Sequence, residues 1–303
     1  MASPVGRFAP TPSGRMHLGN VFAALIAWLS VHSRGGSLVL RMEDLDTQRT
    51  SDENAQILRK DLQWLGLTWD WETPPQSQRT EAYDRYFELL REHCYPCYCT
   101  RSQLHSVNAP HLSDGTYLYP GTCRNLTPLQ RAAFDRPPAW RIAVPDKVWT
   151  VQDLAQGLYT ENLAHHCGDF VLRRADGVYV YQLAVTVDDA EAGVTEVVRG
   201  LDLLSSAPRQ MYLQSLLGFP HPTYGHVPML LAPDGRRLSK RDKDLDLGAL
   251  RQRLTPQQLI GSLAFAAGLL DKNTPISAEE LSSLFSWDKI SGDAIYLDSL
   301  PNL

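Results

Sequence analysis

The N-terminal part of the chain alternates strand and helix patterns, and this alternation constrains the fold more than any other feature of the sequence. Residues 5–9 form a short apolar stretch that predicts a strand, and the breaker-rich loop 10–14 ends it. Residues 19–33 carry apolar side chains at helical spacing, and residues 37–42 predict a buried strand. Two strands joined by a helical crossover run parallel in one sheet. The sequence therefore predicts an α/β fold built on a parallel sheet.

The rest of the chain continues this pattern with one interruption. Further elements are predicted as helices at 52–65, 81–93 and 203–217, strands at 140–144, 170–173 and 178–187, and an extended run at 224–231. The segment at about 94–124 is rich in Cys, Tyr, Pro, Gly and Ser, and we expect a small inserted module there. After Asp246 the apolar residues return to helical spacing. We therefore expect a main domain at 1–245 that includes the insert, and a small helical appendage at 246–303.

Charge and cysteine usage narrow the class of protein. The net charge is −5 and the pI about 6.0, which argues weakly against a general nucleic-acid binder because such proteins are usually basic. The five cysteines are an odd number in a chain of 303 residues, so reduced thiols or a metal site are favoured over a disulfide framework. The sequence has neither a signal-peptide core nor an apolar run long enough for a membrane span, and we expect a cytoplasmic protein.

The loop after the first predicted strand leads into His17-Leu18-Gly19-Asn20 at the start of the first predicted helix. In an open parallel sheet, ligands bind beyond the carboxyl ends of the strands, and a helix N-terminus there offers free N–H groups to phosphate. Gly19 lets a nucleotide approach the backbone closely, and His17 can donate to a phosphate or ribose oxygen. A single H-x-G is more often a helix start with an incidental histidine.

A second cluster, Arg236, Arg237, Lys240 and Arg241, follows the turn Asp234-Gly235. A positioned cation stabilises the charge that develops on a pyrophosphate leaving group, so this loop suits nucleotide chemistry. A solvated basic loop is the commoner outcome for a run of this kind.

Together the two clusters resemble the HIGH and KMSKS motifs of the class I aminoacyl-tRNA synthetases. The glutamyl/glutaminyl branch is indicated by four further motifs: Arg7-Phe8-Ala9-Pro10-Thr11-Pro12-Ser13-Gly14, Leu40-Arg41-Met42-Glu43-Asp44-Leu45-Asp46, Val187-Asp188-Asp189 and Glu196-Val197-Val198-Arg199-Gly200-Leu201-Asp202. The resemblance runs from Val5 to about Asp242 and implies a Rossmann-like catalytic domain. Asn20 stands in place of the second His of HIGH, and Arg237 and Arg241 replace the outer residues of KMSKS; this branch tolerates both departures.

The resemblance implies an ATP site and a glutamate site. For ATP, with Mg²⁺, it implies His17, Gly19, Asn20, Leu238, Ser239 and Lys240, of which His17 and Lys240 would be catalytic. For glutamate it implies Arg7 and Arg199 at the substrate carboxylates, Glu43 at the amino group, Tyr181 as a wall, and Ala9 and Thr11 beside them. A guanidinium fork grips both oxygens of a carboxylate, which makes arginine suitable for this task. The plainer alternatives are surface ion pairs for the arginines and a core position for Tyr181, which we expect on the strand 178–187.

The predicted insert contains Cys97 and Cys99 at C-x-C spacing, with Cys123 further on. Three thiolates can supply most of a tetrahedral zinc site. By spacing alone Cys94 is a rival fourth ligand, whereas the resemblance implies Cys97, Cys99, Tyr119 and Cys123. Free buried cysteines are the alternative. We expect one structural Zn²⁺ here, Cys167 in packing, His165-His166 at the surface, and Asp188-Asp189 orienting the pocket rather than binding metal.

Only about 60 residues follow Lys240, too few for a stem-contact domain and an anticodon-binding domain. The chain thereby resembles the compact glutamyl-Q group of the branch and is expected to act as a monomer without an anticodon-binding domain. This resemblance implies tRNA-independent activation of L-glutamate with ATP, then transfer of glutamate to the cyclopentenediol of queuosine at the wobble position of tRNA(Asp). Two alternatives stay open: a short glutamyl-tRNA synthetase that charges the tRNA 3′ end, and a non-catalytic regulator that binds tRNA or an adenylate.

Overall fold

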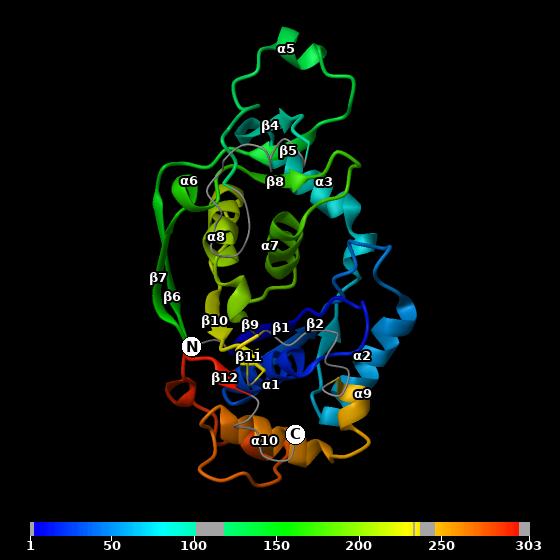
Figure 1. Cartoon of the computed structure of the whole chain (residues 1–303), viewed down its shortest axis with the longest axis vertical. Helices are drawn as coiled ribbons and strands as arrows, with labels where there is room; N and C mark the ends of the chain where they lie inside the picture. The colour runs from blue at the N-terminus through cyan, green and yellow to red at the C-terminus, as the bar shows by residue number, and fades with distance from the viewer. Residues whose placement is uncertain (1–2, 101–117, 233, 237–245, 297–303) are drawn as a thin grey trace.

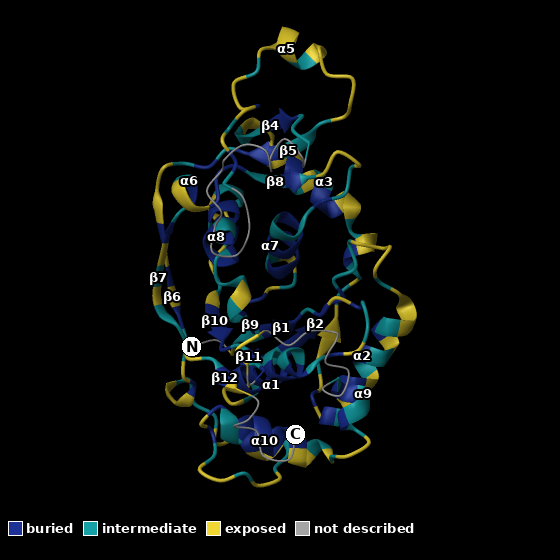
Figure 2. Ribbon diagram, in the orientation of Figure 1, coloured by how far each residue is buried: buried dark blue, intermediate teal, exposed yellow. Residues whose placement is uncertain are grey.

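The chain is described by a computed structural model, which covers residues 3–100, 118–232, 234–236 and 246–296. In Figure 1 the parallel strands lie in the lower half with α1 below them, and a small antiparallel sheet lies near the top. Buried residues in Figure 2 concentrate on the central sheet and the helices packed on it, whereas α5 (Pro128–Ala132) at the top is exposed.

The first strands form the predicted parallel arrangement. β1 (Val5–Phe8) pairs with β2 (Ser37–Leu40), and β2 pairs with β3 (Trp71–Glu72). The crossovers are α1 (Leu18–His32) and α2 (Asp52–Leu65), close to the predicted ranges. α2 begins where the Ser51 hydroxyl accepts from the amide of Asn54, and it ends at Gly66, whose φ of 75° is left-handed.

The second half of the sheet grows on the other side of β1. The backbone amide of Thr195 donates to the Val5 carbonyl oxygen at 2.8 Å, which places β9 (Glu196–Gly200) beside β1. β10 (Thr223–Val227) pairs in parallel with β9, and α8 (Ser206–Leu217) connects the two strands. The chain thus moves away from the β1–β9 boundary in both directions. Such a switch point leaves a crevice at the carboxyl ends of its two strands, where ligands bind.

The insert and its surroundings add antiparallel structure. β4 (Cys94–Cys97), β5 (Ala139–Ile142) and β8 (Phe170–Arg173) form one sheet. β6 (Val148–Asp153) and β7 (Gly157–Asn162) form a long hairpin that reaches β10, and neither strand was predicted. The remaining elements before β9 are η1 (Gln76–Gln78), α3 (Thr80–Leu89), η2 (Arg91–His93) and α6 (Leu163–His166); η3 (Leu201–Leu203) follows β9.

The strand predicted at 178–187 is wrong, because this segment contains helix α7 (Tyr181–Glu191). Seven of its eleven residues are buried, so no polar face interrupts the apolar run and no helical period is visible. Tyr181 is consequently the first residue of a helix rather than part of a strand. The segment is rich in β-branched residues, and its packing overrides their strand preference.

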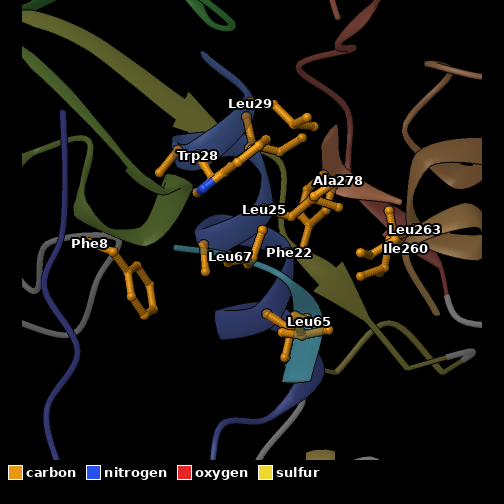
Figure 3. Close-up of a cluster of buried hydrophobic side chains, with 14 of the residues drawn as sticks. Phe8, Phe22, Leu25, Trp28, Leu29, Leu65, Leu67, Ile260, Leu263 and Ala278 are labelled. Atoms are coloured by element: carbon orange, nitrogen blue, oxygen red, sulfur yellow. The ribbon is translucent and has the colours of Figure 1, made fainter. Parts of the chain in front are cut away.

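The C-terminal segment is mainly helical, as predicted, but packs into the core of the sheet. It comprises α9 (Leu247–Leu250), α10 (Pro256–Ala266), α11 (Ala278–Ser282), η5 (Trp287–Lys289) and β12 (Ile295–Tyr296), which pairs with β11 (Leu230–Leu231). Figure 3 shows Ile260 and Leu263 of α10 and Ala278 of α11 beside side chains of α1, and all belong to one buried cluster. None of the helices in the described ranges has the length and apolar composition that crossing a membrane requires.

Candidate functional site

A cavity of about 520 Å³ opens at the β1–β9 switch point. Its walls are the ends of both strands, the loop after β1 and the first turn of α1. Nine residues proposed from the sequence line it: Arg7, Ala9, Thr11, His17, Gly19, Asn20, Glu43, Tyr181 and Arg199. The structure therefore brings the amino-acid and nucleotide candidates of its described ranges into one cavity. Figure 1 shows the strands that carry this cavity between α1 below and α7 and α8 above.

Arg7 lies on β1 and is 4% exposed. One terminal nitrogen donates to the carbonyl oxygen of Val198 at 2.9 Å, and Nε is 3.6 Å from a carboxylate oxygen of Asp189. Nε has no hydrogen-bond partner within the described part of the chain. Burial lowers the pKa of Arg7, and the Asp189 carboxylate opposes this effect. A buried guanidinium with an open donor favours an anionic ligand.

Arg199 enters the same cavity from β9. Its Nε donates to Nε2 of His226 at 3.0 Å, and Nη1 donates to Gln210 at 2.9 Å and to the Tyr181 hydroxyl at 3.2 Å. Nη2 is buried and meets no acceptor among the residues described. The open donors of Arg7 and Arg199 therefore belong to side chains of neighbouring strands that line one cavity.

Glu43 supplies the opposite charge. It follows β2 by three residues, and its amide donates to the Pro10 carbonyl oxygen at 3.0 Å. Arg41 holds its carboxylate at 3.2 Å. Burial raises the pKa of Glu43, while Arg41 and Arg7 act against that rise. An ammonium group in the cavity would stabilise the ionised carboxylate further, as a nearby cation does.

A buried ion network lies behind these side chains. Arg41 has no exposed surface and donates to Asp189 at 2.6 Å. Asp188 accepts from Arg79 at 2.6 Å and from the Gln76 amide at 2.8 Å. Both carboxylates are thus bound by buried or half-buried side chains next to the pocket. The expected surface position of His165 is confirmed, since it pairs with exposed Asp146.

The first turn of α1 forms the nucleotide side of the cavity. His17 is the N-cap residue, and a Cβ built on Gly19 would lie 3.2 Å from its imidazole ring. Glycine at this position therefore leaves room for the imidazole ring. Leu238, Ser239 and Lys240 lie outside the described residues. On their C-terminal side, Asp246 forms a β-bridge with His17, and the Leu247 amide donates to the Met16 carbonyl oxygen at 3.0 Å.

The cysteines of the insert form a second centre. The sulfur atoms of Cys97, Cys99 and Cys123 lie within 4.8 Å of one another, the one such group found in the described ranges. The Tyr119 hydroxyl is 3.4 Å from the Cys97 sulfur and 3.8 Å from the Cys99 sulfur. Three neighbouring sulfurs with a phenol oxygen beside two of them are compatible with a tetrahedral zinc site.

Cys94 lies elsewhere. It packs against the cluster of Phe87, Leu172 and Tyr212, whereas the three other thiols share a cluster with Tyr119. Burial raises the pKa of Cys94 to about 12, as expected for a thiol in apolar surroundings. Cys167 is buried in the same cluster as Cys94, which confirms its expected packing role.

Sequence reasoning missed the polar residues that support Arg199. His226 lies in a predicted extended run, and Asp153 ends the unpredicted strand β6. Gln210 lies on α8, whose buried side also carries Gln214. The available signal was a histidine within an otherwise apolar strand pattern. It becomes informative only when the neighbouring strand and its aspartate are known.

Comparison with known proteins identifies the family. Residues 5–287 match the family model described as tRNA synthetases class I (E and Q), catalytic domain. A glutamyl-Q tRNA(Asp) synthetase of Symbiobacterium thermophilum is 46% identical over 96% of this chain and 94% of its own length. One from Nitratidesulfovibrio vulgaris is 45% identical over 93% of this chain and 91% of its own length.

Solved structures agree on the fold. A glutamate-tRNA synthetase from Elizabethkingia anophelis superposes with a TM-score of 0.83 at 26% identity. The match covers 97% of this chain and 68% of that protein. A glutamate tRNA ligase from Elizabethkingia meningosepticum, in complex with its amino acid, gives a TM-score of 0.82 at 27% identity, over 97% of this chain and 67% of that one.

Proposed function

This chain belongs to the class I (E and Q) tRNA synthetases and, within them, to the glutamyl-Q tRNA(Asp) synthetases, and from this premise we propose how its residues carry out the reaction. It is a ligase that activates L-glutamate with ATP and transfers glutamate to queuosine in tRNA(Asp). The observation that carries the residue assignment is the convergence of two buried, partly open guanidinium groups and one carboxylate on a single cavity. That charge pattern is complementary to an amino acid with an acidic side chain.

In the first step an α-carboxylate oxygen of glutamate attacks the α-phosphorus of ATP. A new O–P bond forms, the bond to the β-phosphate bridging oxygen breaks, and pyrophosphate leaves. Arg7 and Arg199 bind substrate carboxylate oxygens, Glu43 binds the ammonium group, and Tyr181, Ala9 and Thr11 complete the wall. His17, Gly19 and Asn20 receive ATP at the N-terminus of α1, and Mg²⁺ accompanies the nucleotide. Leu238, Ser239 and Lys240 contact ATP, with Lys240 stabilising the leaving group.

In the second step a hydroxyl of the queuosine cyclopentenediol attacks the activated carbonyl carbon. The new ester bond forms as the C–O bond to AMP breaks, and the hydroxyl proton is released. Both steps depend mainly on positioning and charge stabilisation. In the second step the carbonyl is already activated, because the first step has made it part of a mixed anhydride with AMP.

We also propose a structural Zn²⁺ held by Cys97, Cys99, Cys123 and Tyr119. When bound, zinc cross-links the insert through its ligands. The support is the grouping of the three sulfur atoms around the Tyr119 hydroxyl and the separate packing of Cys94. Residues 1–245 and 246–303 are proposed as the catalytic domain and a remnant of the stem-contact domain.

The decisive experiment is ATP–pyrophosphate exchange followed by transfer. Glutamate should support exchange without tRNA, and exchange that needs added tRNA would contradict the proposal. Lys240→Ala should abolish most exchange, and near-wild-type activity in this variant would remove Lys240 from the reaction.

The transfer reaction tests whether the acceptor is queuosine or the 3′-terminal nucleoside of the tRNA. Glutamate should transfer to tRNA(Asp) that carries queuosine and not to the same tRNA with unmodified guanosine. Periodate oxidation of the 3′-terminal ribose also oxidises a queuosine cis-diol, so queuosine-free tRNA is the cleaner control. Charging of queuosine-free tRNA at the 3′ end would instead support a short glutamyl-tRNA synthetase, the activity named for the similar solved structures.

A further inference from the structure

His226 stands between a carboxylate and a pocket arginine. It lies on β10 with no exposed surface. Its Nδ1 is 2.5 Å from a carboxylate oxygen of Asp153, and its Nε2 accepts from Nε of Arg199 at 3.0 Å. The three side chains thus form a continuous buried chain from the β6–β7 turn to the cavity.

The donor and acceptor in each of these hydrogen bonds follow from the positions of the protons on Arg199 and His226. Arg199 Nε always carries a hydrogen, so Nε2 of His226 must be the acceptor, and Nδ1 must carry the single ring proton. That proton then points to the carboxylate of Asp153, which is an acceptor. Burial first, then the nearby Arg199, lower the pKa of His226 to about 4 against the pull of Asp153, so the ring is neutral at physiological pH. If both ring nitrogens carried a proton, the Nε2–H of His226 would face the Nε–H of Arg199, and neither donor would have an acceptor.

Asp153 is itself held in place by the backbone. Its second oxygen accepts from the amides of Ala155, Gln156 and His226, each at 3.0 Å. Burial raises the pKa of Asp153, but the hydrogen bond from the His226 ring and, after it, the amide contacts favour the ionised carboxylate and lower the pKa overall. The carboxylate therefore has one free direction, toward the His226 ring.

The fixed orientation of His226 in turn fixes the guanidinium of Arg199, which lines the cavity. His226 occupies its Nε donor, and Gln210 and Tyr181 occupy Nη1. Nη2 is left as the donor group without a partner in the part of the chain that the structure describes. A guanidinium is planar, so fixing Nε and Nη1 also fixes the direction of Nη2.

We propose that Asp153 and His226 are positioning residues, which hold Arg199 in the one orientation that presents its free N–H groups to the substrate carboxylate. A buried and fully satisfied hydrogen-bond network rigidifies its members and can specify a single arrangement of a neighbouring side chain. The inference rests on the proposed glutamate-binding role of Arg199.

The test uses three variants of the full-length protein. Asp153→Asn offers an amide donor to Nδ1, which moves the ring proton to Nε2 and opposes it to the N–H of Arg199. His226→Asn keeps a donor near Asp153 but loses the acceptor for Arg199. His226→Gln keeps an amide oxygen near the Nε2 position and is the matched control.

The measured quantities are the KM for glutamate and the KM for ATP in ATP–pyrophosphate exchange. Asp153→Asn and His226→Asn should raise the KM for glutamate by about 10- to 100-fold, the loss expected for one charged hydrogen bond, with little change in the KM for ATP. His226→Gln should stay near wild type, and adding it to Asp153→Asn should restore much of the glutamate affinity, because a glutamine side chain has no tautomer to invert. Equal rises in both KM values, or an unchanged KM for glutamate in His226→Asn, would overturn the proposal.

A second measurement does not depend on activity. Nitrogen-15 shifts of His226 in the wild-type protein should show the neutral Nδ1–H tautomer, and in Asp153→Asn the Nε2–H tautomer. An Nε2–H or charged ring in the wild type would overturn the inference even if glutamate is activated. Absence of any glutamate-dependent exchange together with the Nδ1–H tautomer would instead refute the proposed function, and with it the positioning role.

Discussion

Arg7 and Arg199 approach the cavity from adjacent strands, and each has already committed part of its donors to the protein. The remaining donors are buried, so water competes poorly for them and an unpaired carboxylate in their place would be costly. Specificity for glutamate therefore depends on which N–H groups of the two guanidinium groups have no acceptor within the protein.

Removing one guanidinium should therefore weaken glutamate binding selectively. Arg7→Ala should raise the KM for glutamate at least about 30-fold, the equivalent of roughly 2 kcal/mol for a lost buried charge partner, and leave the KM for ATP nearly unchanged. Glutamine should be a poor substrate of the wild type because its amide nitrogen cannot accept from a guanidinium. The measurement is exchange kinetics, with Arg59→Ala, which removes a surface pair with Glu72, as the control. Equal activation of glutamine and glutamate would contradict the assignment.

The neutral state of His226 also has a consequence for folding. Its pKa is about 4 in the folded protein and about 6.5 in an unfolded chain, so between these values the unfolded state binds the extra proton. Stability from this residue is complete above pH 6.5 and is lost as the pH falls toward 4, with a slope of up to about 1.4 kcal/mol per pH unit. Denaturant unfolding at pH 7 and pH 5 should show a larger loss for the wild type than for His226→Gln. Parallel losses in the two proteins would mean that His226 does not carry this linkage.

At the scale of elements, the insert depends on its cysteines more than on apolar burial. Among the described residues of the insert, the buried members of its cluster are Tyr95, Cys97, Tyr119 and Cys123, with a few partly buried neighbours. So small a cluster provides little hydrophobic stabilisation, and a metal cross-link compensates for it.

Cys123→Ser should accordingly remove the bound zinc and make the insert sensitive to proteolysis. Cys94→Ser is the matched control, since Cys94 packs in another cluster and its replacement should leave zinc content unchanged. Tyr119→Phe should weaken zinc binding and preserve the fold. Metal analysis and limited proteolysis would check these outcomes, and full zinc in Cys123→Ser or its loss in Cys94→Ser would contradict the ligand set.

At the scale of the whole molecule, the C-terminal segment shares its core with the catalytic sheet. Leu259, Ile260 and Leu263 of α10 belong to the same buried cluster as Phe22 and Leu25 of α1 (Figure 3). The Trp287 indole donates to the Ser30 hydroxyl at 2.8 Å, and the same ring covers Gly225 of β10, where a Cβ would lie 2.7 Å from it.

Deletion of residues 246–303 should therefore expose part of the core and abolish cooperative folding, because several large apolar side chains would lose their partners at once. Trp287→Phe, which removes only the hydrogen bond and part of the ring, should be much milder, at about 1–3 kcal/mol. Circular dichroism and thermal unfolding would distinguish the two. A deleted chain that unfolds cooperatively near the wild-type temperature would mean that the segment is an independent appendage.

The local pattern was sufficient for the parallel core and for the cavity residues that follow its first two strands. The strands at 5–9 and 37–42, the intervening helix, and the cavity positions of Arg7, His17 and Glu43 follow from breakers, apolar spacing and motif order. These features are short-range, because a helix start or the end of a strand is determined by its own few residues and their neighbours.

Tertiary structure alone decided three matters. It made 181–191 a helix, since burial on all sides removed the period that sequence reasoning needs. It separated Cys94 from Cys97, although both lie on β4, by packing them into different clusters. It joined Asp153, His226 and Arg199, which lie far apart in the chain and contact one another only because strands β6, β10 and β9 are neighbours in the sheet. The sequence by itself determined the fold class, the family and nine of the residues that line the cavity. The orientation of the charged groups required long-range strand pairing, which no local pattern records.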